Sequence, residues 1–197
     1  AEPEQLFGVD NDEIAVLIAK VNILIKYKQR VFYPQIYCMD FLQGISVISQ
    51  NDIFLKRFDY IVTNPPWGAM GKNRNDIIPD ITSNETFSHF FVMAYRQLKT
   101  NGIIRFLFPE SILNVKVHRD IRSFILARTA IMAITTYDGV FAGVTTKYVD
   151  IECANRERNS SFTYYDNLGS REISITAIFE TENLVFNFMD NNDIDVI

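Results

Sequence analysis

Residues Asn64-Pro65-Pro66-Trp67 combine an amide, two prolines and an indole in one short turn. The turn directly follows an apolar run, residues 60–63, that is typical of a buried parallel strand. Prolines fix φ and lack an N–H group, so the pair makes the turn rigid and frees it from strand hydrogen bonding. The Asn64 side chain and the Pro65 carbonyl offer two acceptors, and Trp67 offers a flat aromatic surface. This combination suits a planar ring that carries an amino group; a rigid turn with a packed Trp67 is the alternative.

The composition indicates one folded domain. The chain has 197 residues, of which 48% are hydrophobic and 13% aromatic, so a substantial core can form. No apolar run approaches a membrane span and no signal-peptide pattern opens the chain, so we expect a cytoplasmic protein without a membrane partner. Cys38 and Cys153 lack metal-ligand spacing, and we expect reduced, buried thiols. His89 and His118 are too isolated to indicate a metal centre, and we expect none.

The net charge of −5 argues against a protein that coats nucleic acid by bulk charge. The basic residues are nevertheless clustered. Lys72 and Arg74 follow the Pro-Pro turn, and a second cluster consists of Lys116, His118, Arg119, Arg122 and Arg128. For each cluster, a solvated surface is the alternative to a functional one.

Apolar periodicity predicts strands that alternate with helices. The expected strands cover residues 6–9, 35–39, 58–63, 103–108, 131–137 and 146–153. The expected helices cover residues 12–27 and 117–127, and a helix between them carries an apolar stripe within residues 87–98. Thr82 and Glu85 have capping-box spacing at the start of the second helix, and Asn101-Gly102 is expected to end it. Residues 68–81 are expected to be a long loop. Aromatic and β-branched residues at 162–165, 173–178 and 184–188 predict short strands or an extended arm.

The alternation predicts an α/β fold with a mainly parallel sheet and helices on both faces. In such a sheet ligands bind at the carboxyl ends of the strands, where Asp10 and Asp40 are expected. Asp10 can accept hydrogen bonds from ribose hydroxyls; its alternative role is a helix N-cap, for which Asn11 or Asp12 would serve as well. Asp40 can accept from the amino group of an adenine ring that lies beside Phe41; a simple turn aspartate is the alternative.

An ordered set of segments resembles the adenine-N6 DNA methyltransferases. Phe58 to Gly68 is similar to the catalytic segment of that family. The other similar segments are residues 6–12 and 37–41, which resemble its second and third cofactor segments, and residues 86–98, 102–111 and 139–146. The resemblance covers residues 5–153. The short separation of Asp40 from Asn64 resembles the subclass whose recognition domain lies C-terminal, as in restriction–modification methylases.

The resemblance implies transfer of a methyl group from S-adenosylmethionine to N6 of an adenine that is flipped out of DNA. It implies that the catalytic residues are Asn64, Pro65, Pro66 and Trp67, and that the cofactor-binding residues are Asp10, Asn11, Asp40 and Phe41. It also implies that Trp67 and Phe141 sandwich the base and that Lys72 and Arg74 hold phosphates. The expected partners are DNA and either a specificity or restriction subunit or the rest of a parent chain.

One part of the family pattern has no counterpart in this sequence. None of the eight glycines forms the Gly-rich cofactor turn, and the first strand, which would lie between residues 6–9 and 59–63, is missing. We therefore expect a Rossmann-like methyltransferase fold without these elements: residues 1–153 as a partial catalytic domain and residues 154–197 as a β-rich extension toward an absent recognition domain. We expect a piece of a longer or split enzyme that alone is inactive, binds S-adenosylmethionine weakly or not at all, and self-associates through exposed sheet edges.

Two other functions are compatible with the turn. Methyltransferases of a protein glutamine amide or of a guanine amino group in RNA carry the same Asn-Pro-Pro-aromatic turn, because those targets are also planar conjugated nitrogens. A non-catalytic interaction domain that keeps the methyltransferase fold is the second alternative.

Overall fold

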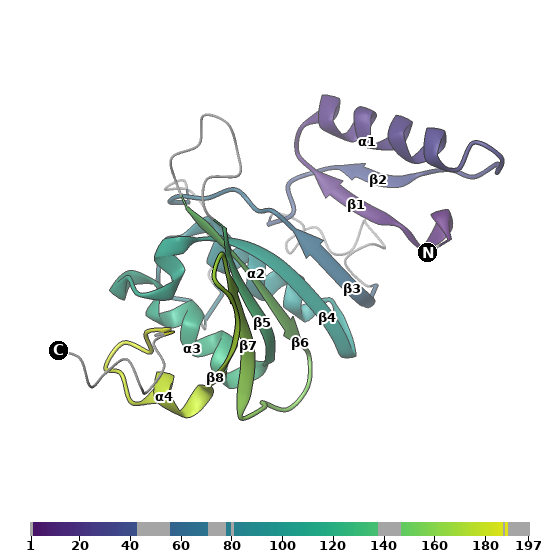
Figure 1. Cartoon of the computed structure of the whole chain (residues 1–197). Helices are drawn as coiled ribbons and strands as arrows, with labels where there is room; N and C mark the ends of the chain where they lie inside the picture. The colour runs from purple at the N-terminus through teal and green to yellow at the C-terminus, as the bar shows by residue number, and fades with distance from the viewer. Residues whose placement is uncertain are drawn as a thin grey trace. The chain divides into compact units, whose positions relative to one another are not determined.

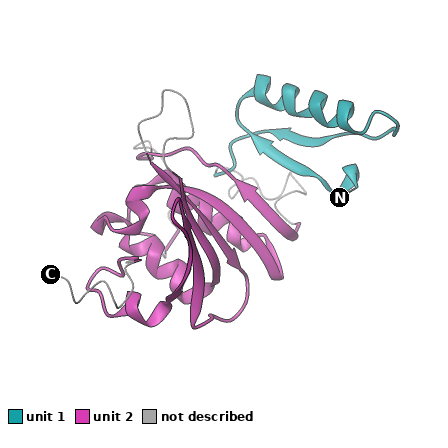
Figure 2. Ribbon diagram, in the orientation of Figure 1, with its two compact units in different colours: residues 1–55 teal, residues 56–197 magenta. Residues whose placement is uncertain are grey.

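The computed structural model describes residues 2–42, 56–70, 78–79, 81–137, 147–186 and 188. The chain divides into two compact units, residues 1–55 and residues 56–197, which are coloured separately in Figure 2. Within the described residues each unit contains its own sheet, of two strands in the first and six in the second. The functional boundary expected at residue 153 stays a prediction.

Unit 1 is a strand–helix–strand motif (Figure 1). After a 3-10 turn, η1 (Pro3–Gln5), come β1 (Phe7–Asp10), α1 (Glu13–Lys26) and β2 (Gln35–Cys38). The two strands are parallel, with Asp10 paired to Cys38, so their carboxyl ends lie at the same edge. These elements confirm the strands and the helix expected in this part of the sequence.

Helix α1 is apolar on two sides. Asp12 is its N-cap, and the Oδ1 atom of Asp12 accepts hydrogen bonds from the backbone N–H groups of Ile14 at 2.8 Å and Ala15 at 3.4 Å. Val16 is buried, at 4% exposure. A second row of side chains, here called the outer stripe, is 42–67% exposed and consists of Ile14, Leu17, Ile18, Val21, Leu24 and Ile25. Such a contiguous exposed apolar row is uncommon on a soluble surface.

Unit 2 is a six-stranded mixed sheet with helices. Its elements are β3 (Phe58–Thr63), α2 (Thr86–Arg96), β4 (Leu98–Pro109), η4 (Glu110–Leu113), η5 (Lys116–His118), α3 (Arg119–Arg128), β5 (Ala130–Tyr137), β6 (Tyr148–Ala154), β7 (Ser161–Asp166), β8 (Gly169–Ser174) and α4 (Ile175–Phe179). The strand order is β3-β4-β6-β5-β7-β8, with β3–β4 and β5–β7 parallel and the other pairs antiparallel. Among the described strands, β1 pairs only with β2 and β3 only with β4, so β1 and β3 each keep one unpaired edge.

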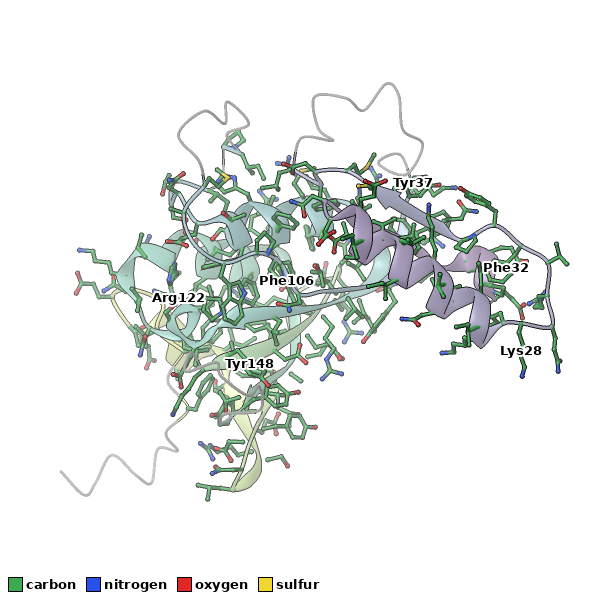
Figure 3. All side chains as sticks on the ribbon, turned by 90° about the horizontal axis from the view of Figure 1, so that it is seen from above. Lys28, Phe32, Tyr37, Phe106, Arg122 and Tyr148 are labelled. Carbon is green, nitrogen blue, oxygen red and sulfur yellow. The ribbon has the colours of Figure 1, made fainter. Side chains whose placement is uncertain are left out.

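The core of unit 2 is formed by aromatic side chains between β4 and α2. Phe106 and Phe108 of β4 are fully buried, and Figure 3 labels Phe106. The ring of Phe91 lies 5.2 Å from that of Phe106, and the ring of Phe87 lies 5.6 Å from that of Phe108. Burying each such side chain contributes about 1.5–3 kcal/mol, so this layer fixes α2 on the sheet. The α/β fold class expected from the sequence is confirmed.

The start of α2 differs from the sequence prediction. The N-cap is Glu85, whose side chain makes no capping hydrogen bond, so the predicted capping box of Thr82 and Glu85 is wrong. The reason is a stronger competing partner, because the backbone N–H and the hydroxyl of Thr82 both donate to the carboxylate of Asp120.

The end of α2 also differs. The helix ends at Arg96 and β4 begins at Leu98, so Asn101 and Gly102 lie within β4 instead of ending the helix. Asn101 has a φ of 63°, and a Cβ at Gly102 would lie 2.9 Å from the backbone oxygen of Phe58. The Asn-Gly pair therefore allows close approach between neighbouring strands.

The last segments form fewer strands than expected. Residues 161–166 form β7 as predicted, but β8 ends at Ser174, and residues 175–179 form the short helix α4. Ile175 and Ile178, three residues apart, are both buried, which is the spacing of one helix face. Residues 184–186 form no strand.

The two cysteines are free thiols in different environments. Cys153 is fully buried, as expected, and burial raises its pKa to about 12. Cys38 is exposed at the end of β2, so the prediction of a buried thiol there is wrong. The reason is that unit 1 has only two four-residue strands and one helix beside them, which leaves the end of β2 open to solvent.

The described part of the chain contains no helix that is both long and apolar enough to cross a membrane. Within the same residues, no group of three or more His, Cys, Asp or Glu side chains could hold a metal ion.

Candidate active site

The turn Asn64 to Trp67 follows β3 directly. Parallel pairing of Thr63 with Phe106 fixes the end of β3 against the carboxyl-terminal half of β4. Beyond that point Asn64 is exposed, Pro65 is buried, Pro66 is exposed and Trp67 is half-buried. The buried Pro65 anchors the turn, and the amide beside it faces solvent.

The polar atoms of this turn have few partners. No hydrogen bond to the Asn64 side chain occurs among the described residues, so its amide oxygen is accessible to a ligand. The Nε1 atom of Trp67 is inaccessible to solvent and has no acceptor within the described ranges. Because the residue is nevertheless half-exposed, its accessible part lies away from the indole N–H.

The residues after the turn are held by a second segment. The backbone oxygen of Gly68 accepts from the N–H of Thr86 at 2.9 Å, and the N–H of Met70 donates to the oxygen of Asn84 at 2.8 Å. An antiparallel bridge joins Ala69 to Glu85 between them. Gly68 has a φ of +102°, a conformation that glycine adopts without strain, so the chain can reverse here.

The predicted cofactor residues lie together at the carboxyl edge of the unit 1 sheet. The N–H of Met39 donates to the backbone oxygen of Asp10 at 2.8 Å, and the Cys38 thiol lies 3.8 Å from the oxygen of Asn11. The ends of the two strands are therefore adjacent. Asp40 and Phe41 follow immediately and are half-buried.

The alternatives for the two carboxylates are partly resolved. Asp12, and not Asp10, is the N-cap of α1. Asp10 is exposed, and its Oδ1 accepts from the N–H of Asp12 at 2.9 Å. The Oδ1 of Asp40 accepts from the N–H of Leu42 at 2.9 Å, which is the local bond of a turn aspartate.

Three residues expected at the site, Lys72, Arg74 and Phe141, lie outside the described residues. The structure thus groups the predicted site residues into two sets, Asp10 to Phe41 in unit 1 and Asn64 to Trp67 in unit 2.

The basic cluster of residues 116–128 is not a single surface. Lys116, Arg119 and Arg128 are exposed, but His118 and Arg122 are buried. Burial lowers the pKa of His118, and it lowers the pKa of Arg122 to about 10. The two buried members, His118 and Arg122, therefore belong neither to a solvated surface nor to a phosphate-binding surface. Both lie in the interior of unit 2.

Sequence reasoning missed the roles of Asp120 and Arg122 on α3. Helical spacing contained a signal for Arg122, because its neighbours at i+3 and i+4, Ile125 and Leu126, belong to the apolar face. Asp120 gave no comparable signal, since its partners lie 37 and 38 residues earlier in the chain.

The fold is similar to that of solved methyltransferase structures. A protein from Listeria monocytogenes described as a class I S-adenosylmethionine-dependent methyltransferase aligns over 81% of this chain and 48% of its own length, with a TM-score of 0.63 and 14% identity. A protein from Vibrio vulnificus YJ016 described as a modification subunit of a type I restriction enzyme aligns over 87% of this chain and 44% of its own, with a TM-score of 0.73 and 19% identity. At these identities the likeness concerns the fold.

Sequence comparison gives the family. Residues 4–141, more than half of the chain, match the Eco57I restriction-modification methylases, and the chain belongs to this family. The Type II methyltransferase M.VspI of Vibrio sp. (strain 343) is 29% identical over 151 residues, which are 74% of this chain. The chain spans about a third of the length of the curated relatives it matches, 35% and 36%. The resemblance to restriction–modification methylases is confirmed at this level.

Proposed function

We propose that these residues belong to a DNA methyltransferase of a restriction–modification system that methylates N6 of a flipped-out adenine. The observation that carries the proposal is the exposed Asn64 amide between buried Pro65 and the end of β3, in a chain of the Eco57I restriction-modification methylase family. The name of M.VspI supports methyl transfer as the activity.

Asn64 and Pro65 act on the adenine amino group. That nitrogen is a poor nucleophile because its lone pair is delocalised into the ring. The Asn64 side-chain oxygen and the Pro65 backbone oxygen accept hydrogen bonds from its two N–H groups. These bonds favour a pyramidal nitrogen whose lone pair is available for reaction. The rate enhancement comes from alignment of the amino nitrogen and from stabilisation of the positive charge that develops on it.

Trp67 holds the base outside the duplex. An amino group on a stacked base is out of reach, so the nucleotide swings out before reaction. Stacking on an aromatic side chain contributes about 1–3 kcal/mol per base, which offsets part of the unstacking. Phe141 completes the stack, and Lys72 and Arg74 hold nearby phosphates.

The cofactor is S-adenosylmethionine, which supplies an electrophilic methyl group when bound. The hydrogen-bond acceptors at the carboxyl edge of the unit 1 sheet fit the hydroxyl and amino groups of this cofactor. Asp10 is exposed, and only one of its carboxylate oxygens has a partner among the described residues, so it can accept from ribose hydroxyls. Asp40 would accept from the amino group of the cofactor's own adenine, Phe41 would lie beside that ring, and Asn11 would contribute to the same site.

The partners are DNA and either further subunits or further domains. The modification subunit from Vibrio vulnificus, with a similar fold, supports a partner that provides sequence specificity or restriction. A recognition element is needed because the turn itself reads only the extruded base.

The test offers three substrates to the full product of the gene that encodes these residues. Methyl-labelled S-adenosylmethionine is incubated with DNA, ribosomal RNA and a release-factor protein, and the products are identified by nucleoside and peptide mass spectrometry. We expect N6-methyladenine in DNA alone. Label on a guanine amino group of the RNA or on a glutamine amide of the protein would contradict the proposal. Label in none of the three substrates would favour a non-catalytic domain.

A further inference from the structure

Residues 68–70, which follow the candidate catalytic turn, belong to none of the described strands of the two sheets. Residues 68–70 instead pair with residues 84–86 through the bonds of Gly68 to Thr86 and of Met70 to Asn84. The Nδ2 group of Asn84 also donates to the oxygen of Met70 at 3.1 Å. Contacts that hold residues 82–86 in place therefore also hold residues 68–70, which directly follow Trp67 in the chain.

The Asp120 carboxylate fixes the start of that second segment. Its Oδ2 accepts from the N–H of Thr82 at 2.8 Å, from the N–H of Ser83 at 2.6 Å and from the Thr82 hydroxyl at 3.4 Å. Hydrogen bonds to a carboxylate are shorter and stronger than those to a neutral acceptor. Asp120 lies in the first turn of α3, which contacts β5, so the anchor belongs to the core of unit 2.

The same segment is held from α2 by His89. The Nε2 atom of His89 lies 3.3 Å from the backbone oxygen of Ser83. A carbonyl oxygen only accepts, so Nε2 carries the proton in this contact. His89 and Ser83 are 3% and 8% exposed, so solvent does not compete with the bond. Ser83 is thereby fixed by its N–H to α3 and by its oxygen to α2.

We propose that Asp120 is a positioning residue for the Asn64 to Trp67 turn. It acts through residues 82–86 and contacts neither base nor cofactor. Without the carboxylate, two N–H groups lose their acceptor and the paired segment loosens, which frees the backbone that follows Trp67. This inference rests on the proposed function for its catalytic consequence, but its structural consequence can be measured without activity.

The direct test uses tryptophan fluorescence, because Trp67 is the single tryptophan of the 197-residue chain. Acrylamide quenching of Trp67 is compared between the wild-type chain, Asp120→Ala and Asp120→Asn. The control is Asp59→Ala, which removes an exposed carboxylate paired with Lys99 at 2.8 Å on the strand before the turn. Circular dichroism verifies that each variant is folded at the temperature used.

The expected quenching follows a graded order. Asp120→Ala raises the quenching constant by about twofold, because local opening exposes the indole. Asp120→Asn gives an intermediate value, since it keeps an acceptor but loses the charge. If the alanine variant does not fold, the asparagine variant decides. Quenching in Asp120→Asn, and in any folded Asp120→Ala, that equals the Asp59→Ala control would overturn the proposal.

A kinetic test in the full gene product distinguishes this inference from the proposed function. We expect Asp120→Ala to lower kcat for DNA methylation by about 10- to 100-fold, because small misplacement of catalytic groups is costly. The dissociation constant for S-adenosylmethionine should be unchanged. An altered cofactor affinity with unchanged kcat would contradict the positioning role. A wild-type enzyme without methylation activity would contradict the proposed function and leave the fluorescence result standing.

Discussion

The guanidinium of Arg122 donates two hydrogen bonds to the backbone oxygen of Asn183, from Nη2 at 2.9 Å and from Nε at 3.2 Å. Its Nη1 donates to the backbone oxygens of Ile112 at 2.8 Å and Val115 at 2.9 Å. Arg122, labelled in Figure 3, is fully buried. One side chain thus joins α3, the turns after β4 and the segment after α4.

Arg122→Ala should destabilise unit 2 by about 3 kcal/mol or more. Three carbonyl oxygens lose their donors, that of Ile112 in a buried bond and those of Val115 and Asn183 in part-buried bonds, and an unsatisfied buried group costs about 1–3 kcal/mol. Urea unfolding followed by circular dichroism measures the change. Arg119→Ala, on the same helix but exposed, is the control and should change stability by no more than about 0.5 kcal/mol. Equal effects of the two substitutions would show that the buried bonds contribute little.

Stability should fall on the acid side through His118. Burial lowers the pKa of His118 from its ordinary value of 6.5, with Glu85 and Asp120 opposing the shift and Arg122 adding to it. The unfolded chain therefore takes up a proton at a higher pH than the folded chain, and the free energy of unfolding decreases as pH falls below about 6.5. His118→Gln should flatten this decrease in urea titrations between about pH 7 and about pH 5. Parallel pH profiles for the two proteins would contradict this assignment.

Local patterns in the sequence predicted the strands and the turn well. The apolar run before Asn64 predicted β3 and its parallel pairing, and the helical spacing from Ile14 to Ile25 predicted α1. The predicted burial of that strand is wrong, because β3 is the edge strand of the described sheet and Tyr60 and Val62 are 50% and 67% exposed. Thr82 was misassigned because the capping rule considers only neighbours in sequence, whereas its partner is Asp120 in a different helix. Arg122 was grouped with exposed cations because a charge cluster does not reveal which members point inward.

The placement of the two site halves could not be predicted from the sequence. Periodicity placed Asp10 and Asn64 at strand ends, but it contains no information on the docking of one strand set against another. The structure likewise describes each unit by itself.

Cys38 offers a chemical probe of the unit 1 edge. It is exposed beside Asn11 at the end of β2, whereas Cys153 is fully buried. Iodoacetamide should therefore alkylate Cys38 and spare Cys153 in the folded chain, as peptide mass spectrometry would measure. In the full gene product, S-adenosylhomocysteine should slow alkylation of Cys38 if this edge binds the cofactor. An unchanged rate of Cys38 alkylation at saturating S-adenosylhomocysteine would show that this edge does not bind the cofactor.

The outer stripe of α1 should promote self-association of the 197-residue chain. Its six apolar side chains are exposed, and contiguous apolar surface favours association. Leu17→Glu combined with Val21→Lys should lower the mass measured by light scattering at high concentration. Because both positions are exposed, circular dichroism should show an unchanged fold. A wild-type chain that is monomeric at every concentration would exclude association through this stripe and through the unpaired sheet edges alike.

The Asn64 side chain is the centre of the proposed mechanism, and its substitution gives the most direct measurement. Methyl transfer to DNA is compared in the full gene product for wild type, Asn64→Ala and the control Asn114→Ala, which removes an exposed amide elsewhere. We predict that Asn64→Ala lowers kcat by about 100-fold or more while thermal stability stays unchanged, because the removed acceptor stabilises charge in the transition state. Wild-type methylation by Asn64→Ala would contradict the account.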